Sequence, residues 1–332
     1  MRPFAYKIGI GMRILTVNKN DAGQRLDKFL TKSVKGLPTS LMYKYIRTKK
    51  IKVNRARADL KYMLSEGDEI QLFIKDEFFD SPEKDSSALS SIKPKLEIVY
   101  EDENILLCNK RPGVLVHEDK EGGENTLIMH VQAYLCQKGE YSPDDEQSFA
   151  PALCNRIDRN TGGIVLAAKN AMALRVMNEK IRNNEISKFY LCAVHGVPKK
   201  KSDTLHGYLR KDSKNNTVTV TDAPLPGSKE IITKYKVLSE KGGNSLLEVE
   251  LVTGRTHQIR AHLSHIGHPL LGDGKYGVNR DDKKSGYKYQ ALYAYRLRFD
   301  FSGDNKTELD YLRGKEVKLP RGAVWFEKEF NE

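Results

Sequence analysis

The stretch of residues 155–163 carries side chains that could do nucleophilic or acid–base chemistry. Asp158 lies there between Arg156 and Arg159, and Thr161 and two glycines follow it. Nearby cations favour the ionised form of a carboxyl group, and an ionised carboxylate can act as a nucleophile or a base without a metal or a cofactor. The competing interpretation is structural, because an aspartate in a loop most often accepts a hydrogen bond from its own turn.

Two strands are predicted near this loop in the sequence. Residues 164–168 are small and β-branched apolar residues, which predicts a buried strand directly after the loop. Residues 188–196 alternate as a strand does, and Tyr190 lies on one face of it. A tyrosine in a strand usually only fills the core, so this pattern alone gives Tyr190 no chemical role.

A helix is predicted to begin near residues 254–262. Its spacing brings His257, Arg260 and Ser264 together on one face, beside an apolar stripe. No two histidines in this region have the i, i+4 spacing of a helical zinc site, and carboxylates are absent nearby. We therefore expect no metal at the four histidines His257, His262, His265 and His268.

These three stretches resemble, in the same order, the motifs of the RluA-type pseudouridine synthases. The first motif is His-Arg-Leu-Asp-x-x-Thr-Ser-Gly, in which the aspartate is catalytic. In this chain the histidine, leucine and serine are replaced by Asn155, Ile157 and Gly162. The remaining motif positions are matched by Arg156, Asp158, Thr161 and Gly163.

The second and third motifs of that family are also present. The second, Lys-x-Tyr-x-Ala-x-Val-x-Gly, is matched by Lys188, Tyr190, Val194 and Gly196. The third begins at Gly254 with Gly-Arg-Thr-His-Gln-Ile-Arg and is the most specific signal in the sequence. It continues through Pro269, Gly272, Asp273, Tyr276 and Gly277.

The resemblance implies an enzyme that converts uridine in RNA to pseudouridine without a cofactor. Asp158 would be the catalytic carboxylate, Arg260 its cationic partner, and Tyr190 the ring that packs on the uracil. The uridine would have to leave its stack first, and Arg156 would occupy the vacated space. The residues expected to bind the substrate are Arg156, Thr161, Arg255, His257 and Gln258.

Composition is compatible with a protein that binds a polyanion. The 332 residues leave room for two domains, 30% of them are charged, and the formal net charge is +12. The four cysteines form no C-x-x-C pair. No apolar run approaches the roughly 18 residues that a membrane span needs, and the start of the chain is a poor signal peptide. We expect a cytoplasmic monomer that binds no membrane.

The first quarter of the chain carries most of the positive charge. Residues 13–75 hold fifteen Lys and Arg against six Asp and Glu, a difference of +9. Apolar spacing predicts helices near residues 24–30 and 39–46, and alternation predicts strands at 51–54 and 67–73. The charged face could simply aid solubility.

The order of these elements resembles the small RNA-binding domain of the S-four type. A small-subunit ribosomal protein, bacterial tyrosyl-tRNA synthetases and several rRNA-modifying enzymes share that domain. Its cations would contact phosphates, which sets affinity rather than sequence preference. The residues expected to make these contacts are Lys28, Lys44, Arg47, Lys49, Lys50 and Lys52.

The predicted fold class is α+β. We expect an extension at residues 1–12, a small α/β RNA-binding domain at 13–75 and an acidic, serine-rich linker at 76–95. Residues 96–332 would form the catalytic domain, a mixed and mainly antiparallel β-sheet of the pseudouridine synthase type with flanking helices.

The resemblance favours large-subunit (23S) rRNA as the substrate, and leaves two alternatives open. One is a synthase that modifies tRNA. The other is a non-catalytic RNA-binding factor for ribosome assembly, although such a factor would not need Asp158, Tyr190 and Arg260 together. The sequence does not indicate which uridines are modified.

Overall fold

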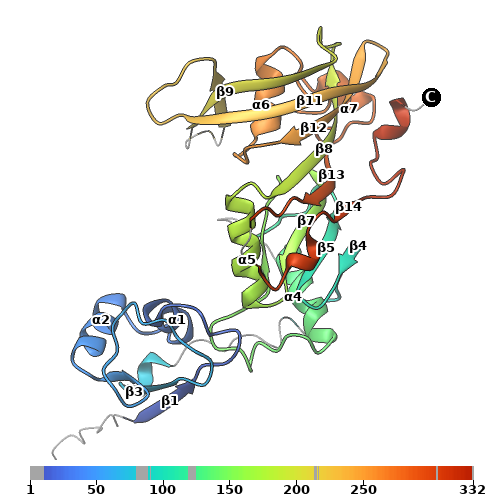
Figure 1. The fold of residues 1–332 in the computed structure, drawn as a ribbon. Coiled ribbons are helices and arrows are strands. Elements are labelled where there is room, and N and C mark those ends of the chain that lie inside the picture. Colours follow the sequence, from blue (N-terminus) through green and yellow to red (C-terminus); the bar gives the residue numbers. More distant parts are fainter. Residues whose placement is uncertain are drawn as a thin grey trace, which may run out of the picture. The chain divides into compact units, whose positions relative to one another are not determined.

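The computed structural model describes residues 11–79, 89, 91–118, 125–212, 215, 217–303 and 306–330. The chain divides into two compact units, which Figure 1 shows as ribbons. The first unit consists of Met1–Pro94, Gln132–Pro151 and Lys169–Met172, and the second of Lys95–Val131, Ala152–Ala168 and Ala173–Glu332. Residues 1–10 of the expected extension, and residues 80–88 and 90 of the expected linker, lie outside the described part.

The first unit contains a three-stranded antiparallel sheet and two helices. The strands lie in the order β1 (Met12–Thr16), β3 (Glu69–Phe73) and β2 (Ile51–Val53). Helices α1 (Leu26–Ser33) and α2 (Thr39–Arg47) bury their apolar faces in one core with β2 and β3. These four elements were predicted from apolar spacing, whereas β1 was not.

The first residues of the expected linker form a short 3-10 helix, η1 (Asp76–Phe78). Phe78 and Phe79 pack against the core of the first unit. This start of the acidic segment is therefore anchored by its two aromatic rings.

The second unit is built on one large sheet, and the α+β prediction is confirmed. The main path of the sheet has the order β10-β9-β11-β12-β8-β13-β7-β5-β4, with β14 paired to β13 and β6 paired to β7. Among the described residues, every strand pairing in this sheet is antiparallel except that of β13 with β7. Its strands are β4 (Ile98–Glu101), β5 (Ile105–Lys110), β6 (Ala152–Leu153), β7 (Gly162–Ala168), β8 (Ile186–His195), β9 (Ser202–Asp212), β10 (Thr217–Thr221), β11 (Lys229–Lys241), β12 (Asn244–Leu251), β13 (Leu292–Phe299) and β14 (Glu316–Lys318).

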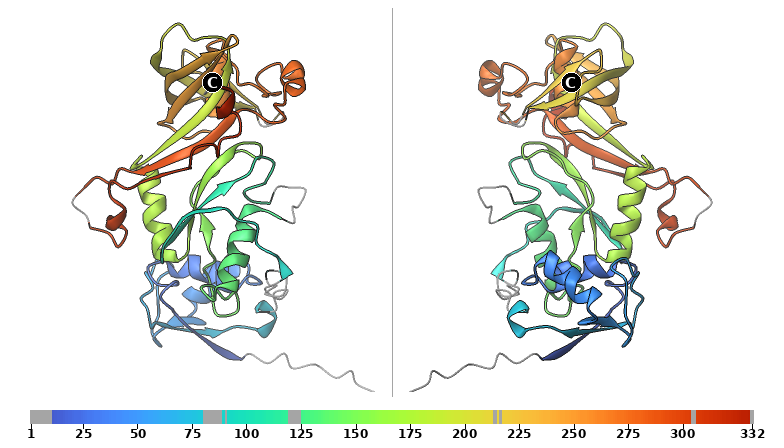
Figure 2. Two further views of the ribbon diagram at one scale, coloured as in Figure 1. Left: turned by 90° about the vertical axis from the view of Figure 1, so that its right-hand side faces the viewer. Right: turned by 90° about the vertical axis from the view of Figure 1, so that its left-hand side faces the viewer.

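Helix α6 (Gln258–His265) packs on strands β9, β10 and β11, as Figures 1 and 2 show. Ala261 joins the small apolar cluster that those strands form, so one face of α6 is fixed to the sheet. No helix of the described residues is both long and apolar enough to cross a membrane. The other helical segments are α4 (Leu127–Gln137), α5 (Ala171–Arg182), α7 (Arg280–Lys284), η2 (Asp310–Leu312) and η3 (Glu327–Phe330).

Strand β13 brings two of the predicted motifs together. Tyr190 of β8 lies opposite Ala294 of β13, and Gly163 of β7 pairs with the same Ala294 from the other side. The loop that ends at Gly162 and the strand that carries Tyr190 are thus separated by one strand. The sheet thereby fixes the spacing between the predicted catalytic loop and the predicted base-stacking ring.

Candidate active site

A cavity of about 490 Å³ lies in the second unit, where the three motif segments meet. The loop before β7, strand β8 and the start of helix α6 all contribute to its wall. All eight residues expected to bind substrate or catalyse the reaction line this one cavity. They are Arg156, Asp158, Thr161, Tyr190, Arg255, His257, Gln258 and Arg260.

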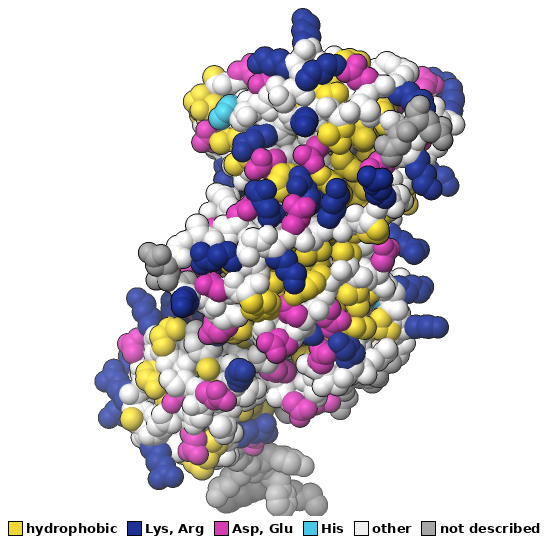
Figure 3. Space-filling model, turned by 45° about the vertical axis from the view of Figure 1, so that its right-hand side comes forward, with side chains coloured by type: hydrophobic (Ala, Val, Ile, Leu, Met, Phe, Trp, Pro, Cys, Tyr) yellow, Lys and Arg dark blue, Asp and Glu magenta, His cyan; other side chains and the backbone are white. Residues whose placement is uncertain are grey.

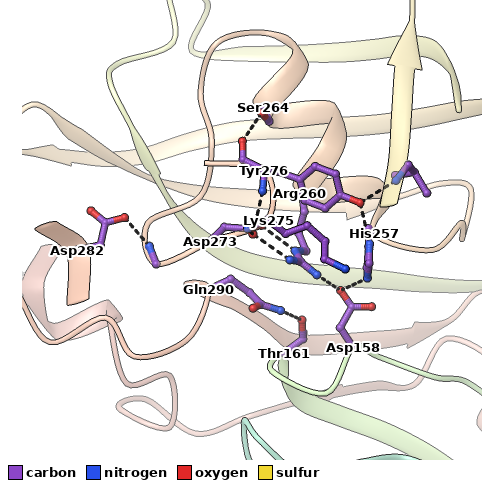
Figure 4. Close-up of polar contacts among 12 residues, drawn as sticks. Asp158, Thr161, His257, Arg260, Ser264, Asp273, Lys275, Tyr276, Asp282 and Gln290 are labelled. Atoms are coloured by element: carbon purple, nitrogen blue, oxygen red, sulfur yellow. Dashed lines mark hydrogen bonds and ion pairs between the residues drawn. The ribbon is translucent and has the colours of Figure 1, made fainter. Parts of the chain in front are cut away.

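Arg260 is held between two carboxylates, as Figure 4 shows. Its Nε and Nη2 donate to the two oxygens of Asp273 at 2.7 and 2.9 Å, and its Nη1 donates to Oδ2 of Asp158 at 2.9 Å. Arg260 and Asp273 are buried, whereas the side chain of Asp158 is 25% exposed. Asp273 therefore fixes the guanidinium group on its buried side, and one N–H of Arg260 is donated to Asp158, the carboxylate that lines the cavity.

The pKa shifts of Arg260 and Asp273 agree with these hydrogen bonds. Burial opposes the charge on Arg260, but Asp273 and Asp158 raise its pKa above the ordinary value for arginine. Burial also opposes the charge on Asp273, yet hydrogen bonds from Arg260 and from the backbone of Lys275 and Tyr276 lower its pKa. Among the described residues, none donates a hydrogen bond to Oδ1 of Asp158. That oxygen remains available to a substrate.

His257 lies beside the same carboxylate. It precedes α6 in a left-handed conformation, with φ of 53°, and its Nε2 is 3.8 Å from Oδ2 of Asp158. Its Nδ1 is 2.8 Å from the hydroxyl of Tyr276, whose oxygen accepts a hydrogen bond from the backbone N–H of Val218. This geometry allows the Tyr276 hydroxyl to donate its hydrogen to Nδ1, and in that tautomer the histidine hydrogen is on Nε2, toward Asp158.

Burial lowers the pKa of His257 below its ordinary value. Asp158 opposes this shift and Arg260 reinforces it. The imidazole is therefore neutral at pH 7. Figure 4 shows Arg260 and His257 approaching Asp158 from the same side.

Tyr190 forms an uncharged part of the cavity wall. It is buried on β8, and burial raises the pKa of its hydroxyl far above the ordinary value for tyrosine. Lys188, two residues earlier on β8, also lines the cavity, and burial lowers the pKa of its ammonium group. The wall thus offers a flat ring beside a desolvated cation.

The other predicted residues differ in how much of their side chain is free. Arg156 and Arg255 are exposed. Thr161 is buried, and its hydroxyl accepts a hydrogen bond from Gln290 at 3.2 Å. Gln258 uses both ends of its amide on backbone and side-chain groups of the protein. Thr161 and Gln258 therefore shape the cavity, whereas the two arginines can reach a ligand.

Two departures from the family motif have structural causes. Asn155 stands in place of the motif's histidine, and its Oδ1 accepts a hydrogen bond from the N–H of Leu166, which ties the loop to β7. Gly162 stands in place of serine, and any Cβ there would collide with the ring of Tyr293. The next residue, Gly163, has φ of +118°, and a Cβ on it would collide with the backbone of Ala294.

The sequence patterns gave no role to Lys110, whose ammonium group bonds the backbone of the loop that carries Asp158. Its buried ammonium group donates to the carbonyls of Arg111, Val114 and Arg159 at 3.2, 2.9 and 2.9 Å. Burial lowers its pKa to about 8, although Asp158 opposes that shift. The signal in the sequence was a single lysine at the end of an apolar strand, directly before a turn.

The roles of Asp273 and Tyr276 were missed as well. Both are positions of the third motif, so the sequence marked them without showing what they contact. The described residues contain no group of three or more His, Cys, Asp or Glu side chains that could hold a metal ion.

The cations predicted for the first unit lie on its surface. Five of the six are exposed, and Lys52 is half-buried. A hollow of about 590 Å³ is lined by Lys44 and Arg47 of α2 together with Tyr43 and Arg57, which had not been singled out. An exposed tyrosine among cations can stack on a base while they contact phosphates.

Comparisons with known proteins match both units. The family model described as RNA pseudouridylate synthase matches residues 104–265, and the S4 domain model matches residues 24–70. An uncharacterized RNA pseudouridine synthase of Mycoplasma genitalium is 34% identical over 94% of this chain and 96% of its own length. The ribosomal large subunit pseudouridine synthase C of Vibrio parahaemolyticus is 31% identical over 96% of this chain and 97% of its own length.

A solved structure supports the fold independently. The human RNA pseudouridylate synthase domain containing protein 1 superimposes with a TM-score of 0.54 at 22% identity, over 70% of this chain and 87% of its own. The level of identity to the bacterial relatives, over nearly their whole length, shows descent from a common ancestor. This chain therefore belongs to the RNA pseudouridylate synthase family, a family of RNA isomerases, and carries an S4 domain besides its synthase domain.

Proposed function

We propose that this enzyme converts specific uridines of large-subunit (23S) rRNA to pseudouridine, with Asp158 as the catalytic carboxylate. The observation that carries the catalytic assignment is the Arg260 to Asp158 ion pair, 2.9 Å long, in a cavity shared by all three motifs. The choice of rRNA follows the relatives of Vibrio and of several other bacteria, which are named as large-subunit synthases. An rRNA substrate also implies the cytoplasm, and we expect the enzyme to act as a monomer.

The reaction breaks the bond between ribose C1′ and N1 of the base and forms one between C1′ and C5. A proton leaves C5 and another is added at N1, so no redox partner or external atom is required. The proposed routes are attack of the carboxylate on C1′, removal of a proton from C2′, and addition to the ring. All three need an ionised carboxylate with one free oxygen, and Oδ1 of Asp158 meets this requirement because Arg260 bonds only Oδ2.

Tyr190 would provide the surface on which the uracil stacks. Because burial raises the pKa of its hydroxyl, the ring stays neutral and suits an uncharged pyrimidine. His257 would direct its Nε2–H toward Asp158 and the ribose and would orient both, since its other nitrogen is bonded to Tyr276.

The uridine must leave its stack before it can reach this cavity. Arg156 is exposed at the cavity and lies two residues before Asp158 in the same loop. A planar guanidinium group can stack on bases and bond a phosphate. We assign to Arg156 the role of filling the space that the uridine leaves.

The S4 domain would supply most of the phosphate contacts. Its predicted cations are Lys28, Lys44, Arg47, Lys49, Lys50 and Lys52. Figure 3 shows Lys and Arg side chains spread over one face of the molecule, interspersed with Asp and Glu. Such contacts raise affinity for any RNA, and the cavity of the synthase domain would then select the uridine.

The substitution Asp158→Asn should abolish pseudouridine formation and leave RNA affinity within a few-fold of the wild type. The amide keeps the shape of the side chain but cannot act as a nucleophile or a base. Tritium release from 23S rRNA labelled at uridine C5 measures turnover, and tRNA labelled in the same way tests the other substrate class. Asp222→Asn, an exposed aspartate of the same unit, is the control. Turnover by Asp158→Asn at a comparable rate would refute the catalytic assignment.

The pH dependence of the reaction should reflect the neutral His257. Its lowered pKa means that it gains a proton only below the ordinary value of about 6.5. Below that pH a second cation beside Asp158 would make its carboxylate a weaker nucleophile and base. We expect kcat/KM to fall on the acid side with a midpoint below pH 6.5, and the fall to move to lower pH in His257→Gln. A midpoint above pH 6.5, or one that His257→Gln leaves in place, contradicts this role.

Removing two cations of the S4 domain should weaken RNA binding without changing kcat. The double variant Lys44→Ala, Arg47→Ala loses two side chains of the hollow in the first unit. Each lost phosphate contact should reduce the slope of log affinity against log salt by about 1. Lys75→Ala is the control because Lys75 already pairs with Glu77 at 3.2 Å. An unchanged salt slope in the double variant would mean that RNA does not lie on this surface.

A further inference from the structure

The second unit contains another cavity of about 490 Å³, which shares no lining residue with the active-site cavity. Three aromatic rings line it, those of Tyr289, Tyr293 and Trp325. Two cationic side chains, Arg111 and Lys288, line it as well. Neither the catalytic roles proposed above nor the family motifs account for this combination.

The rings of this cavity are held in place before any ligand binds. Trp325 packs edge-to-face on Tyr287, with centroids 5.2 Å apart, and the hydroxyl of Tyr293 donates to Asn109 at 2.9 Å. Asn109 in turn donates to Glu97, the one carboxylate among the lining residues. Tyr289 is 37% exposed and so offers a free aromatic surface. A pre-formed aromatic wall is what base stacking requires.

The two cations are available to a ligand. Arg111 and Lys288 are both exposed, and in the described part of the chain neither side chain forms an ion pair. Aromatic rings beside unpaired cations match a nucleotide, because the base can stack while a cation meets the phosphate. A lipid or an apolar peptide would leave the cations without a partner, and RNA is already the partner of this family.

Hydrogen bonds join the wall of this cavity to the catalytic loop. Gly113, next to Pro112 of the cavity, donates to the carbonyl of Arg159 at 2.9 Å, and Nε of Arg159 donates back to Gly113 at 3.2 Å. Gln290, next to Tyr289, donates to Thr161 at 3.2 Å. Arg159 and Thr161, which line the active-site cavity, are thus hydrogen-bonded to residues that adjoin this second cavity.

We infer that the cavity binds one unpaired base of the RNA substrate. The base would stack on Tyr289 and Trp325, and its phosphate would meet Arg111 and Lys288. The inference rests on the proposed function for the identity of the RNA, but base binding itself requires no turnover.

Trp325 is the only tryptophan of the chain, so its fluorescence reports this cavity directly. The full-length protein would be titrated with a ten-nucleotide oligouridylate and with an abasic RNA of the same length and charge. We expect the oligouridylate to quench the emission in a saturable way and the abasic RNA to leave it nearly unchanged.

Two variants separate stacking from charge. Tyr289→Leu keeps an apolar side chain but removes the free ring, and it should abolish the quenching and weaken oligouridylate binding by about 5- to 150-fold. Arg111→Glu, at an exposed position, should weaken binding and make the loss of affinity with salt shallower, because one phosphate contact is removed. Tyr311→Leu and Lys306→Ala are the controls, since both residues are exposed elsewhere in the same unit.

Several results would overturn the inference. They are RNA binding without quenching, equal quenching by the abasic RNA, and unchanged quenching in Tyr289→Leu. If the protein proved to be a dimer in solution and Tyr289→Leu dissociated it, the cavity would be assigned to binding a second copy of the chain instead. Modification of 23S rRNA without any change in Trp325 emission would refute this site and leave the proposed function intact. Quenching of Trp325 without turnover would support this site and contradict the proposed function.

Discussion

The fold of the active site depends on the two ion pairs that Arg260 makes. Asp273 holds the guanidinium group from the buried side through two hydrogen bonds, and the remaining N–H bonds Asp158 at the cavity. Removing one partner of a buried pair costs about 3–5 kcal/mol, because the other charge is left without compensation. The folded protein therefore keeps the arginine in one place, and the arginine in turn places one oxygen of Asp158 and leaves the other free.

The large sheet brings these charges together from distant parts of the chain. Asp158 and Arg260 are 102 positions apart. Strand β13 joins the loop before β7 to strand β8, and helix α6 is fixed on β9 to β11. The close approach of β7 to β13 leaves no room for side chains at Gly162 and Gly163. The geometry of the candidate site is thus set by strand register.

Much of this could be predicted from the sequence, because the informative patterns are local. Apolar spacing and alternation predicted α1, α2 and the strands β2, β3, β7 and β8, and motif spacing selected the residues that line the cavity. Contacts between distant residues could not be predicted. The parallel pairing of β7 with β13, the anchoring of Arg260 by Asp273 and the orientation of His257 by Tyr276 each depend on segments that meet only in the folded chain. The cavity at Trp325 left no local pattern in the sequence at all.

The substitution Asp273→Asn tests the central claim most directly, because Asp273 contacts Arg260 but does not line the active-site cavity. The amide removes the negative charge that fixes Arg260, while residue 158 itself is not substituted. Single-turnover rates on 23S rRNA, with circular dichroism to confirm folding, would measure the effect. The account predicts a fall in rate of about 100-fold with unchanged RNA affinity. A folded Asp273→Asn protein that reacts within about threefold of the wild-type rate would contradict it. A tenfold change in rate corresponds to about 1.4 kcal/mol of activation free energy, so a change of about threefold is well below the predicted effect.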